Sequence, residues 1–347
     1  MARNEGPEII TTIYPQTLAI RKLPVNLKQD HRQLFAHELQ RTIPPSRLLR
    51  FKNIRVSSDG ILFSGTRILP ESFAFPHHRD EWKLRSTVKF LAANQFVRHR
   101  RRIEAEVLWI TDYWSKAYFH WLADALTRLF VVQDRLDQLV LTLPGEYEGL
   151  HFVAPTLKAF GVKRVEFIKP NEVLECRSLL MPTHTAPPGH YNPEVIHGVR
   201  EVLLSAFGAA GADERIYISR RNASKRKIVN ETEITDVLRR FEFQIVCAEE
   251  LSFQEQVRTF SRARHLVSNH GAGLTNMLFM KDGGSVLELR HQSDCINNCY
   301  FTLSSALNLK YFFQACEPST DGPDPHTADL IVDPHELENN LTLMLEQ

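Results

Sequence analysis

From Glu106 onward, short apolar runs alternate with longer amphipathic ones. This alternation constrains the fold more than any other feature, because it is typical of βαβ units built around a mainly parallel sheet. The first hundred residues lack the pattern, and we expect them to form an irregular, β-containing segment. Further along, the pattern predicts strands over 106–110, 138–142, 164–168 and 178–181, and helices over 119–132 and near 149–160.

A proline-rich stretch then interrupts the alternation. Residues 182–193 contain four prolines and a glycine, which cannot continue a helix or a central strand. We therefore expect an α/β protein of two doubly wound, Rossmann-like domains that face a cleft. The first would span 1–190, with the irregular extension over 1–105 and an α/β core over 106–181, and the second 191–347, closed by a helix after Pro334. In the second domain we expect helices near 193–207, 231–240, 252–262 and 274–280, and strands near 215–219, 243–247, 264–268 and 285–290.

Composition and net charge indicate the general class of the protein. Hydrophobic residues make up 43% of the chain and charged residues 24%, as in soluble globular proteins with a real core. The formal net charge is +1, which argues against a nucleic-acid partner. The basic run 98–102 is a local exception, and it suits either a solvated edge or contact with an acidic acceptor or a membrane-linked glycolipid.

The cysteines and the N-terminus bear on location. Five scattered cysteines do not describe a disulfide framework. The first residues carry no apolar signal-peptide core, and no run is long enough to cross a membrane. We expect a cytoplasmic protein, either free or associated peripherally with a membrane.

The segment SNHGAGLTN, residues 268–276, is the most informative motif for the chemistry of ligand binding. It joins an expected strand to an expected helix, and its two glycines let a ligand approach the backbone closely. Free N–H groups and the helix dipole at such a turn favour an anion such as a diphosphate. His270 stands at the edge of the turn, where it could add a hydrogen-bond donor. The alternative interpretation is a tight turn with a capped helix.

A second cluster follows the strand expected at 215–219. Ser219 is followed by Arg220 and Arg221, and further cations extend the loop to residue 227. Arginine presents a planar fork suited to phosphate oxygens. Because loops after parallel strands share one edge of a sheet, this loop and the glycine turn could hold the same diphosphate. A solvated basic loop is the alternative.

Two acidic residues also stand out. Glu288 lies in an apolar strand, where a carboxylate needs a partner, and it could accept hydrogen bonds from ribose hydroxyls. Asp124 lies four residues after His120, so both share one helix face. A histidine oriented by a carboxylate is a candidate general base, and Asp124 alone is a second candidate. A structural histidine at the edge of the core is the alternative for His120.

No Asp-x-Asp pair, Walker loop or convincing set of metal ligands is present in the sequence. A bound diphosphate would then be neutralised by Arg, Lys, His and a helix N-terminus, without a required metal or other cofactor.

Taken together, the motifs resemble glycosyltransferase family 61 over about residues 105–315. They are FHWL-x-D-x-L-x-R from Phe119, YISR from Tyr217, Asn230-Glu231 and HGAGLTN from His270; Thr127 stands where relatives often have proline. The resemblance implies a GT-B fold and metal-independent, inverting transfer from a nucleotide sugar, commonly a UDP-sugar. It also implies an acceptor side in 1–190 and a nucleotide-sugar side in 191–347. Without a visible membrane anchor, the chain resembles the soluble bacterial members linked to surface polysaccharides.

The resemblance predicts two partners, a nucleotide-sugar donor and a saccharide or glycolipid acceptor. Together with the chemistry of the motifs, it also predicts roles for individual residues. His120 or Asp124 would be the base, and Glu288 would hold the ribose. The other donor-binding residues would be Ser219, Arg220, Arg221, His270, Gly271, Ala272, Gly273 and Leu274.

Two other functions fit the sequence less well. One is an NAD-type oxidoreductase, although Asn276 replaces the third glycine of its fingerprint. The other is a nucleotide- or saccharide-binding protein without turnover on the same scaffold.

Overall fold

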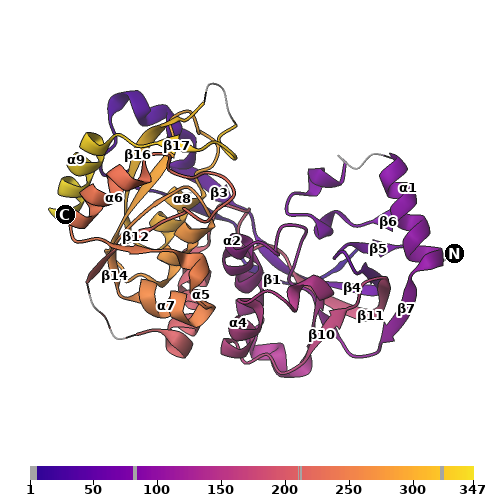
Figure 1. The fold of residues 1–347 in the computed structure, drawn as a ribbon. Coiled ribbons are helices and arrows are strands. Elements are labelled where there is room, and N and C mark those ends of the chain that lie inside the picture. The colour runs from indigo at the N-terminus through magenta and orange to yellow at the C-terminus, as the bar shows by residue number, and fades with distance from the viewer. Residues whose placement is uncertain (1–5, 81–83, 210, 212, 321–323) are drawn as a thin grey trace. The chain divides into compact units, whose positions relative to one another are not determined.

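The computed structural model describes residues 6–80, 84–209, 211, 213–320 and 324–347. The chain divides into two compact units (Figure 1). Unit 1 contains residues 1–17 and 44–188, and unit 2 contains residues 18–43 and 189–347. The division differs from the expected domains in one respect, because residues 18–43 pack with the C-terminal half of the chain.

The described residues of unit 1 form a nine-stranded mixed sheet. Strand β11 (Glu172–Pro182) lies at its centre and pairs in parallel with β7 (His99–Ile103) and β8 (Val107–Leu108). The parallel part continues through β9 (Val140–Pro144) and β10 (Val165–Ile168). The remaining strands are β1 (Glu8–Tyr14), β4 (Ser46–Ser57), β5 (Leu62–Ser64) and β6 (Arg67–Ile68).

The α/β class is confirmed, but unit 1 is not doubly wound throughout. Strand β4 pairs antiparallel with β11 from Leu48–Pro182 to Ser57–Val173, and β1 and β5 pair antiparallel with β4. The residues expected to form an irregular extension therefore supply a long strand beside the centre of the sheet. The reason is that β4 buries Leu49, Phe51, Ile54 and Val56 against the apolar residues of β11.

The helix expected over 119–132 is present and bears an irregularity. It comprises α2 (Tyr118–His120), a π-helical turn η6 (Trp121–Ala125) and α3 (Leu126–Phe130). π-helical turns inside helices are frequent at functional sites. The other α-helices in the described part of unit 1 are α1 (Leu84–Ala92) and α4 (Val153–Ala159).

The described part of unit 2 holds a six-stranded sheet that matches the doubly wound expectation. Its order is β13 (Gln244–Val246), β12 (Glu214–Ile218), β14 (Ala263–Asn269), β15 (Ser285–His291), β16 (Lys310–Pro318) and β17 (Leu330–Ile331). All neighbours pair in parallel except β16 and β17. In Figure 1, α6 (Glu231–Arg240) and α9 (Pro334–Leu345) lie on one side of this sheet, and α5 (Pro193–Phe207) and α7 (Phe253–Ser261) on the other.

Local sequence signals explain where several of these helices begin. The side chain of Asn192 caps α5, which has Pro193 in its first turn. Ser252 and Glu255 form a reciprocal capping box at α7, and Asp333 caps α9. Each cap satisfies backbone N–H groups that have no partner inside the helix. A short helix α8 (Cys299–Ala306) follows the loop after β15.

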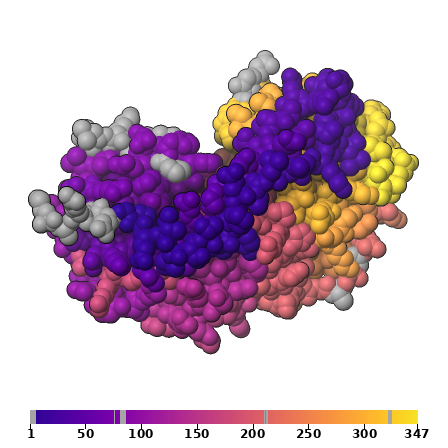
Figure 2. Space-filling view, turned by 180° about the vertical axis from the view of Figure 1, so that it is seen from behind, coloured from indigo at the N-terminus to yellow at the C-terminus, as the bar shows by residue number. Residues whose placement is uncertain are grey.

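Residues 18–43 complete the core of unit 2. Leu34 and Phe35 pack with Phe301, Tyr311 and Phe313, and Phe35 is fully buried. Strands β2 (Thr17–Ile20) and β3 (Gln40–Ile43) pair with each other at the ends of this segment. Figure 2 shows indigo N-terminal residues lying over the orange and yellow residues of unit 2.

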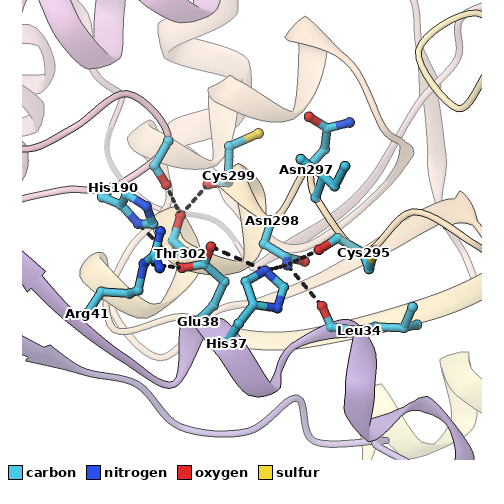
Figure 3. Close-up of polar contacts among 12 residues, drawn as sticks. Leu34, His37, Glu38, Arg41, His190, Cys295, Asn297, Asn298, Cys299 and Thr302 are labelled. Atoms are coloured by element: carbon cyan, nitrogen blue, oxygen red, sulfur yellow. Dashed lines mark hydrogen bonds and ion pairs between the residues drawn. The ribbon is translucent and has the colours of Figure 1, made fainter. Parts of the chain in front are cut away.

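A buried carboxylate fixes the same segment by polar contacts (Figure 3). Glu38, whose side chain is 7% exposed, lies within ion-pair distance of Arg21 (3.3 Å), Arg41 (3.6 Å), His37 (3.5 Å) and His190 (3.5 Å). Arg21 also donates to Nδ1 of His190 at 3.1 Å. Burial, and then the charges of Arg21, Arg41 and His37, lower the pKa of His190 to about 4.

This low pKa predicts acid destabilisation. A histidine that is neutral in the folded state but protonated below pH 6.5 when unfolded removes stability as the pH falls from 6.5 to about 4. The loss corresponds to about 3 kcal/mol. Chemical denaturation between pH 4 and 7 should show the fall, and His190→Gln should reduce it. His265 of β14, whose pKa burial also lowers to about 4, should contribute separately, so His265→Gln is the matched comparison. An unchanged pH profile in His190→Gln would contradict the prediction.

Candidate functional site

In unit 1 the predicted catalytic residues form a hydrogen-bonded pair. Nδ1 of His120 lies 2.6 Å from Oδ2 of Asp124. Asp124 is buried, whereas the His120 side chain is 21% exposed. Because an ionised carboxylate can only accept, the proton lies on Nδ1 and the free lone pair on Nε2. This geometry suits a histidine that takes a proton from a substrate hydroxyl.

A second histidine–aspartate pair lies in the same unit and was missed from the sequence. Nε2 of His184 lies 2.9 Å from Oδ2 of Asp112, and the His184 side chain is 19% exposed. Burial raises the pKa of Asp112, but the hydrogen bond from His184 and the charges of His184 and Arg128 outweigh it and lower that pKa to about 2. Asp112 follows the strand expected at 106–110, so the rule that functional residues follow parallel strands could have identified it. His184, 72 residues away along the chain, gave no such signal.

Arg128 connects the two pairs. Its side chain is fully buried, its Nη1 is 4.0 Å from Oδ2 of Asp112, and its Nε donates to the carbonyl of Pro182 at 2.8 Å. Burial lowers the pKa of Arg128 to about 10 against the opposing charges of Asp112 and Asp124, so it remains charged at neutral pH. One buried cation therefore lies beside Asp112 and acts on Asp124 through its charge.

In unit 2 the glycine turn and the basic loop meet, as the sequence predicts. The strands β12 and β14 are parallel neighbours, so the residues after each lie at one edge. A Cβ atom on Gly271 would lie only 2.4 Å from Nη1 of Arg220. The backbone of Gly271 is extended, with φ of 165°, so the backbone angles do not require glycine, but its missing side chain leaves room for the guanidinium. The guanidinium of Arg220 thus lies directly on the turn.

The helix that follows the glycine turn differs in type and extent from the one expected from the sequence. The residues after it form a 3₁₀ helix, η10 (Ala272–Phe279), instead of an α-helix over 274–280. The N–H of Leu274 donates to the carbonyl of Gly271, and the Leu274 side chain is buried in the core. Leu274 is therefore not available to a ligand. Ala272 and Gly273, which begin the helix and are half-buried, keep N–H groups without a partner inside it.

Arg220 and Arg226 make this edge strongly cationic. Burial, and then the charge of Arg226, lower the pKa of Arg220. Among the described residues, neither arginine forms an ion pair with a carboxylate, and the Nε atoms of both are buried without a hydrogen-bond partner. Two half-buried guanidinium groups in this state favour an anion. Arg226, with φ of 57°, was not singled out from the sequence.

His270 has a fixed orientation. Its Nδ1 lies 2.5 Å from Oε1 of Glu288, and the hydroxyl of Tyr311 donates to Oε2 of the same carboxylate at 2.5 Å. The ring of Tyr300 packs edge-on against His270 with centroids 5.0 Å apart. Nε2 of His270 is therefore the ring nitrogen left for a ligand.

The predicted contact between Glu288 and a ribose does not fit this geometry. Glu288 is fully buried and both of its oxygens are engaged. Burial raises its pKa, but His270, Arg290 and Tyr311 together lower it below the ordinary value. Glu288 instead positions His270, which is the partner that a carboxylate in an apolar strand requires.

Two other predicted donor residues have protein partners. The hydroxyl of Ser219 donates to Glu231 at 2.7 Å and accepts from the N–H of Arg221, so it shapes the loop. Arg221 is exposed and lies 3.6 Å from Glu250, so its charge is partly compensated.

No group of three or more His, Cys, Asp or Glu within the described ranges is placed to hold a metal ion. Among those same residues, no helix is long and apolar enough to cross a membrane.

Comparison with known proteins found a matching family and several similar proteins. The sequence model of the family described as Glycosyltransferase 61 matches residues 118–287, a range that includes the His120–Asp124 pair, the basic loop and the glycine turn. The chain is also similar to proteins named EGF domain-specific O-linked N-acetylglucosamine transferase. The identity is 32% over 120 residues for the Bos taurus protein, covering 33% of this chain and 22% of the relative, and 33% over 98 residues for the Drosophila melanogaster protein, covering 27% and 18%.

The aligned region thus spans less than a quarter of the relatives' length. This chain matches the glycosyltransferase 61 family, a family of enzymes, over residues 118–287.

Proposed function

We propose that this protein moves a sugar from a nucleotide-sugar donor to a hydroxyl of a saccharide or glycoconjugate acceptor. The reaction is inverting and requires no metal, and a UDP-sugar is the first donor to test. The observation that carries this proposal is the position of Arg220 on the glycine turn, at the carboxyl edge of the unit 2 sheet. Arg220, Arg226 and Nε2 of His270 offer a diphosphate the cationic donors that it needs as a leaving group.

The base in this proposal is His120, oriented by Asp124. An inverting transfer needs one base to remove the proton of the acceptor hydroxyl as the bond to the anomeric carbon forms. Nε2 of His120 is free for this task because Nδ1 is hydrogen-bonded to Asp124. His184, held by Asp112 in the same manner, is the second imidazole that a substrate could meet in unit 1.

The names of the relatives suggest which substrates to test. N-acetylglucosamine is the sugar in those names and an EGF domain is the acceptor, so both belong in the first screen. The GT-B arrangement, a role in surface polysaccharide synthesis, a cytoplasmic location and peripheral membrane contact remain predictions from the sequence. An NAD-type oxidoreductase is disfavoured by the family match.

Calorimetry with UDP, GDP, CMP and NAD, in the presence of EDTA, tests the donor site. One nucleoside phosphate should bind, and Arg220→Ala should weaken that binding at least tenfold, because a lost charge-assisted hydrogen bond costs about 1.5–3 kcal/mol. Arg239→Ala is the control, since Arg239 is an exposed arginine of α6 paired with Asp236. Binding of NAD alone, or equal affinity in Arg220→Ala and the wild type, would contradict the proposal.

A further inference from the structure

Unit 1 contains a cavity of about 550 Å³ that none of the predicted site residues lines. It lies where three parallel strands end. Asp112, Tyr113 and Lys116 follow β8, Glu146 follows β9 and Asn171 follows β10. Ligands of such sheets bind outside the carboxyl ends of the strands, and this volume is within the usual range for small-molecule sites, about 300–1,000 Å³.

The walls of the cavity are closely packed at two glycines. Gly60, at φ of +79°, would place a Cβ atom 3.2 Å from Cγ of Pro144. A Cβ atom on Gly145 would lie 2.8 Å from the carbonyl oxygen of Ile168. Side chains at either position would force the wall to move. The cavity is therefore built into the fold.

The charges in the cavity select against a phosphate ligand. The acidic residues Asp59, Asp112 and Glu146 line it together with the cations Arg98 and Lys116. Arg98 is already paired with Asp59 at 2.8 Å, and Lys116 lies 3.4 Å from Glu146. With its cations matched by acids, the cavity suits an uncharged ligand rich in hydrogen-bonding groups.

The rim of the cavity offers the two surfaces that a sugar ring needs. Tyr113 is 62% exposed, and its flat ring can pack against the apolar face of a pyranose. Lys116 and Glu146, both more than half exposed, supply a donor and an acceptor for ring hydroxyls. A saccharide presents an apolar face and hydroxyl edges of this kind.

The cavity also adjoins the candidate base. The N–H of Trp114 donates to Oδ1 of Asp112 at 2.8 Å, and the Trp114 ring lies 5.2 Å from the ring of His120. The segment from Asp112 to His120 therefore runs from the lining of the cavity to the histidine proposed to deprotonate the acceptor.

From these observations we infer that the cavity holds the acceptor, and that the acceptor group bound there is a saccharide. This inference rests on the proposed function. A volume of this size encloses roughly one or two sugar rings, whereas a folded polypeptide domain could contact only the rim.

Saturation-transfer NMR on the full chain tests the inference. The probes are the methyl β-glycosides of glucose, galactose, xylose and N-acetylglucosamine, and a folded polypeptide domain with free serine hydroxyls. At least one glycoside should bind, and Tyr113→Ala and Lys116→Ala should each weaken it at least about fivefold, as expected for loss of an aromatic or charged contact. Lys163→Ala is the matched control, because Lys163 is also an exposed lysine paired with a carboxylate, that of Asp137, elsewhere in unit 1. Its affinity should equal that of the wild type.

Three results would overturn the inference: no glycoside binds, the two cavity variants bind as the wild type does, or only the polypeptide binds. Nucleotide calorimetry on the same samples separates this failure from failure of the proposed function. Nucleotide binding without glycoside binding overturns the acceptor cavity and leaves the transferase proposal standing. Glycoside binding without any nucleotide binding overturns the acceptor role of the cavity together with that proposal.

Discussion

Replacing His120 by alanine is expected to reduce turnover by about 10²–10⁴-fold, the usual contribution of a positioned general base. The affinity for the nucleotide should change little, because His120 lies in unit 1 and the proposed donor residues lie in unit 2. Asp124→Asn should also lower turnover, since an amide no longer fixes the proton on Nδ1 as the carboxylate at 2.6 Å does.

Steady-state kinetics with saturating donor, together with nucleotide calorimetry, check this prediction. His151→Ala is the matched control, because His151 is an exposed histidine of the same unit that packs on Phe152. Turnover of His120→Ala within about threefold of the His151→Ala value would exclude His120 as the base, because a base contributes far more. His184→Ala would then be the next variant to measure.

The second large effect concerns stability. Arg128→Met should lower the free energy of unfolding by about 3–5 kcal/mol, as expected when one partner of a buried charge network is removed. The side chains of Asp112 and Asp124 are 2% and 3% exposed, so neither carboxylate can turn to water for compensation. Methionine keeps most of the volume and removes only the charge and the hydrogen bond to Pro182.

Denaturant unfolding at neutral pH measures this loss. Arg135→Met is the control, since Arg135 is exposed on the same unit and should change stability by less than about 0.5 kcal/mol. Combining Arg128→Met with Asp112→Asn should restore part of the stability, because the uncompensated charge is then removed. Equal stability of the Arg128→Met and Arg135→Met variants would show that the two carboxylates do not depend on this cation.

Much of unit 2 could be predicted from the sequence, because its signals are local. Each apolar strand and amphipathic helix can be recognised from the hydrophobic pattern of about ten residues. Parallel strands then bring the loops that follow them to one edge of the sheet. That rule alone places Arg220 beside the turn at Gly271. The role of Glu288 was not accessible in this way, since its two partners, His270 and Tyr311, are defined only when three strands are assembled.

In unit 1, several features depend on long-range contacts that local sequence patterns do not predict. The antiparallel pairing of β4 with β11 joins residues more than a hundred positions apart. The sequence of either strand gives no signal that identifies the other as its partner. The Asp112–His184 pair depends on the same assembly, because β8 and the end of β11 must first lie side by side. The cavity is likewise formed by segments that lie far apart along the chain, so no single motif marks it.

The packing of residues 18–43 on unit 2 has a consequence for synthesis of the chain. Phe35 is synthesised well before its partners Phe301, Tyr311 and Phe313, which follow it along the chain by more than two hundred residues. Domains generally fold as units while the chain emerges, but unit 2 cannot finish its core until β16 has been made. Until then, Leu34 and Phe35 of the segment 18–43 remain exposed to solvent. Chaperones recognise exposed apolar surface of this kind.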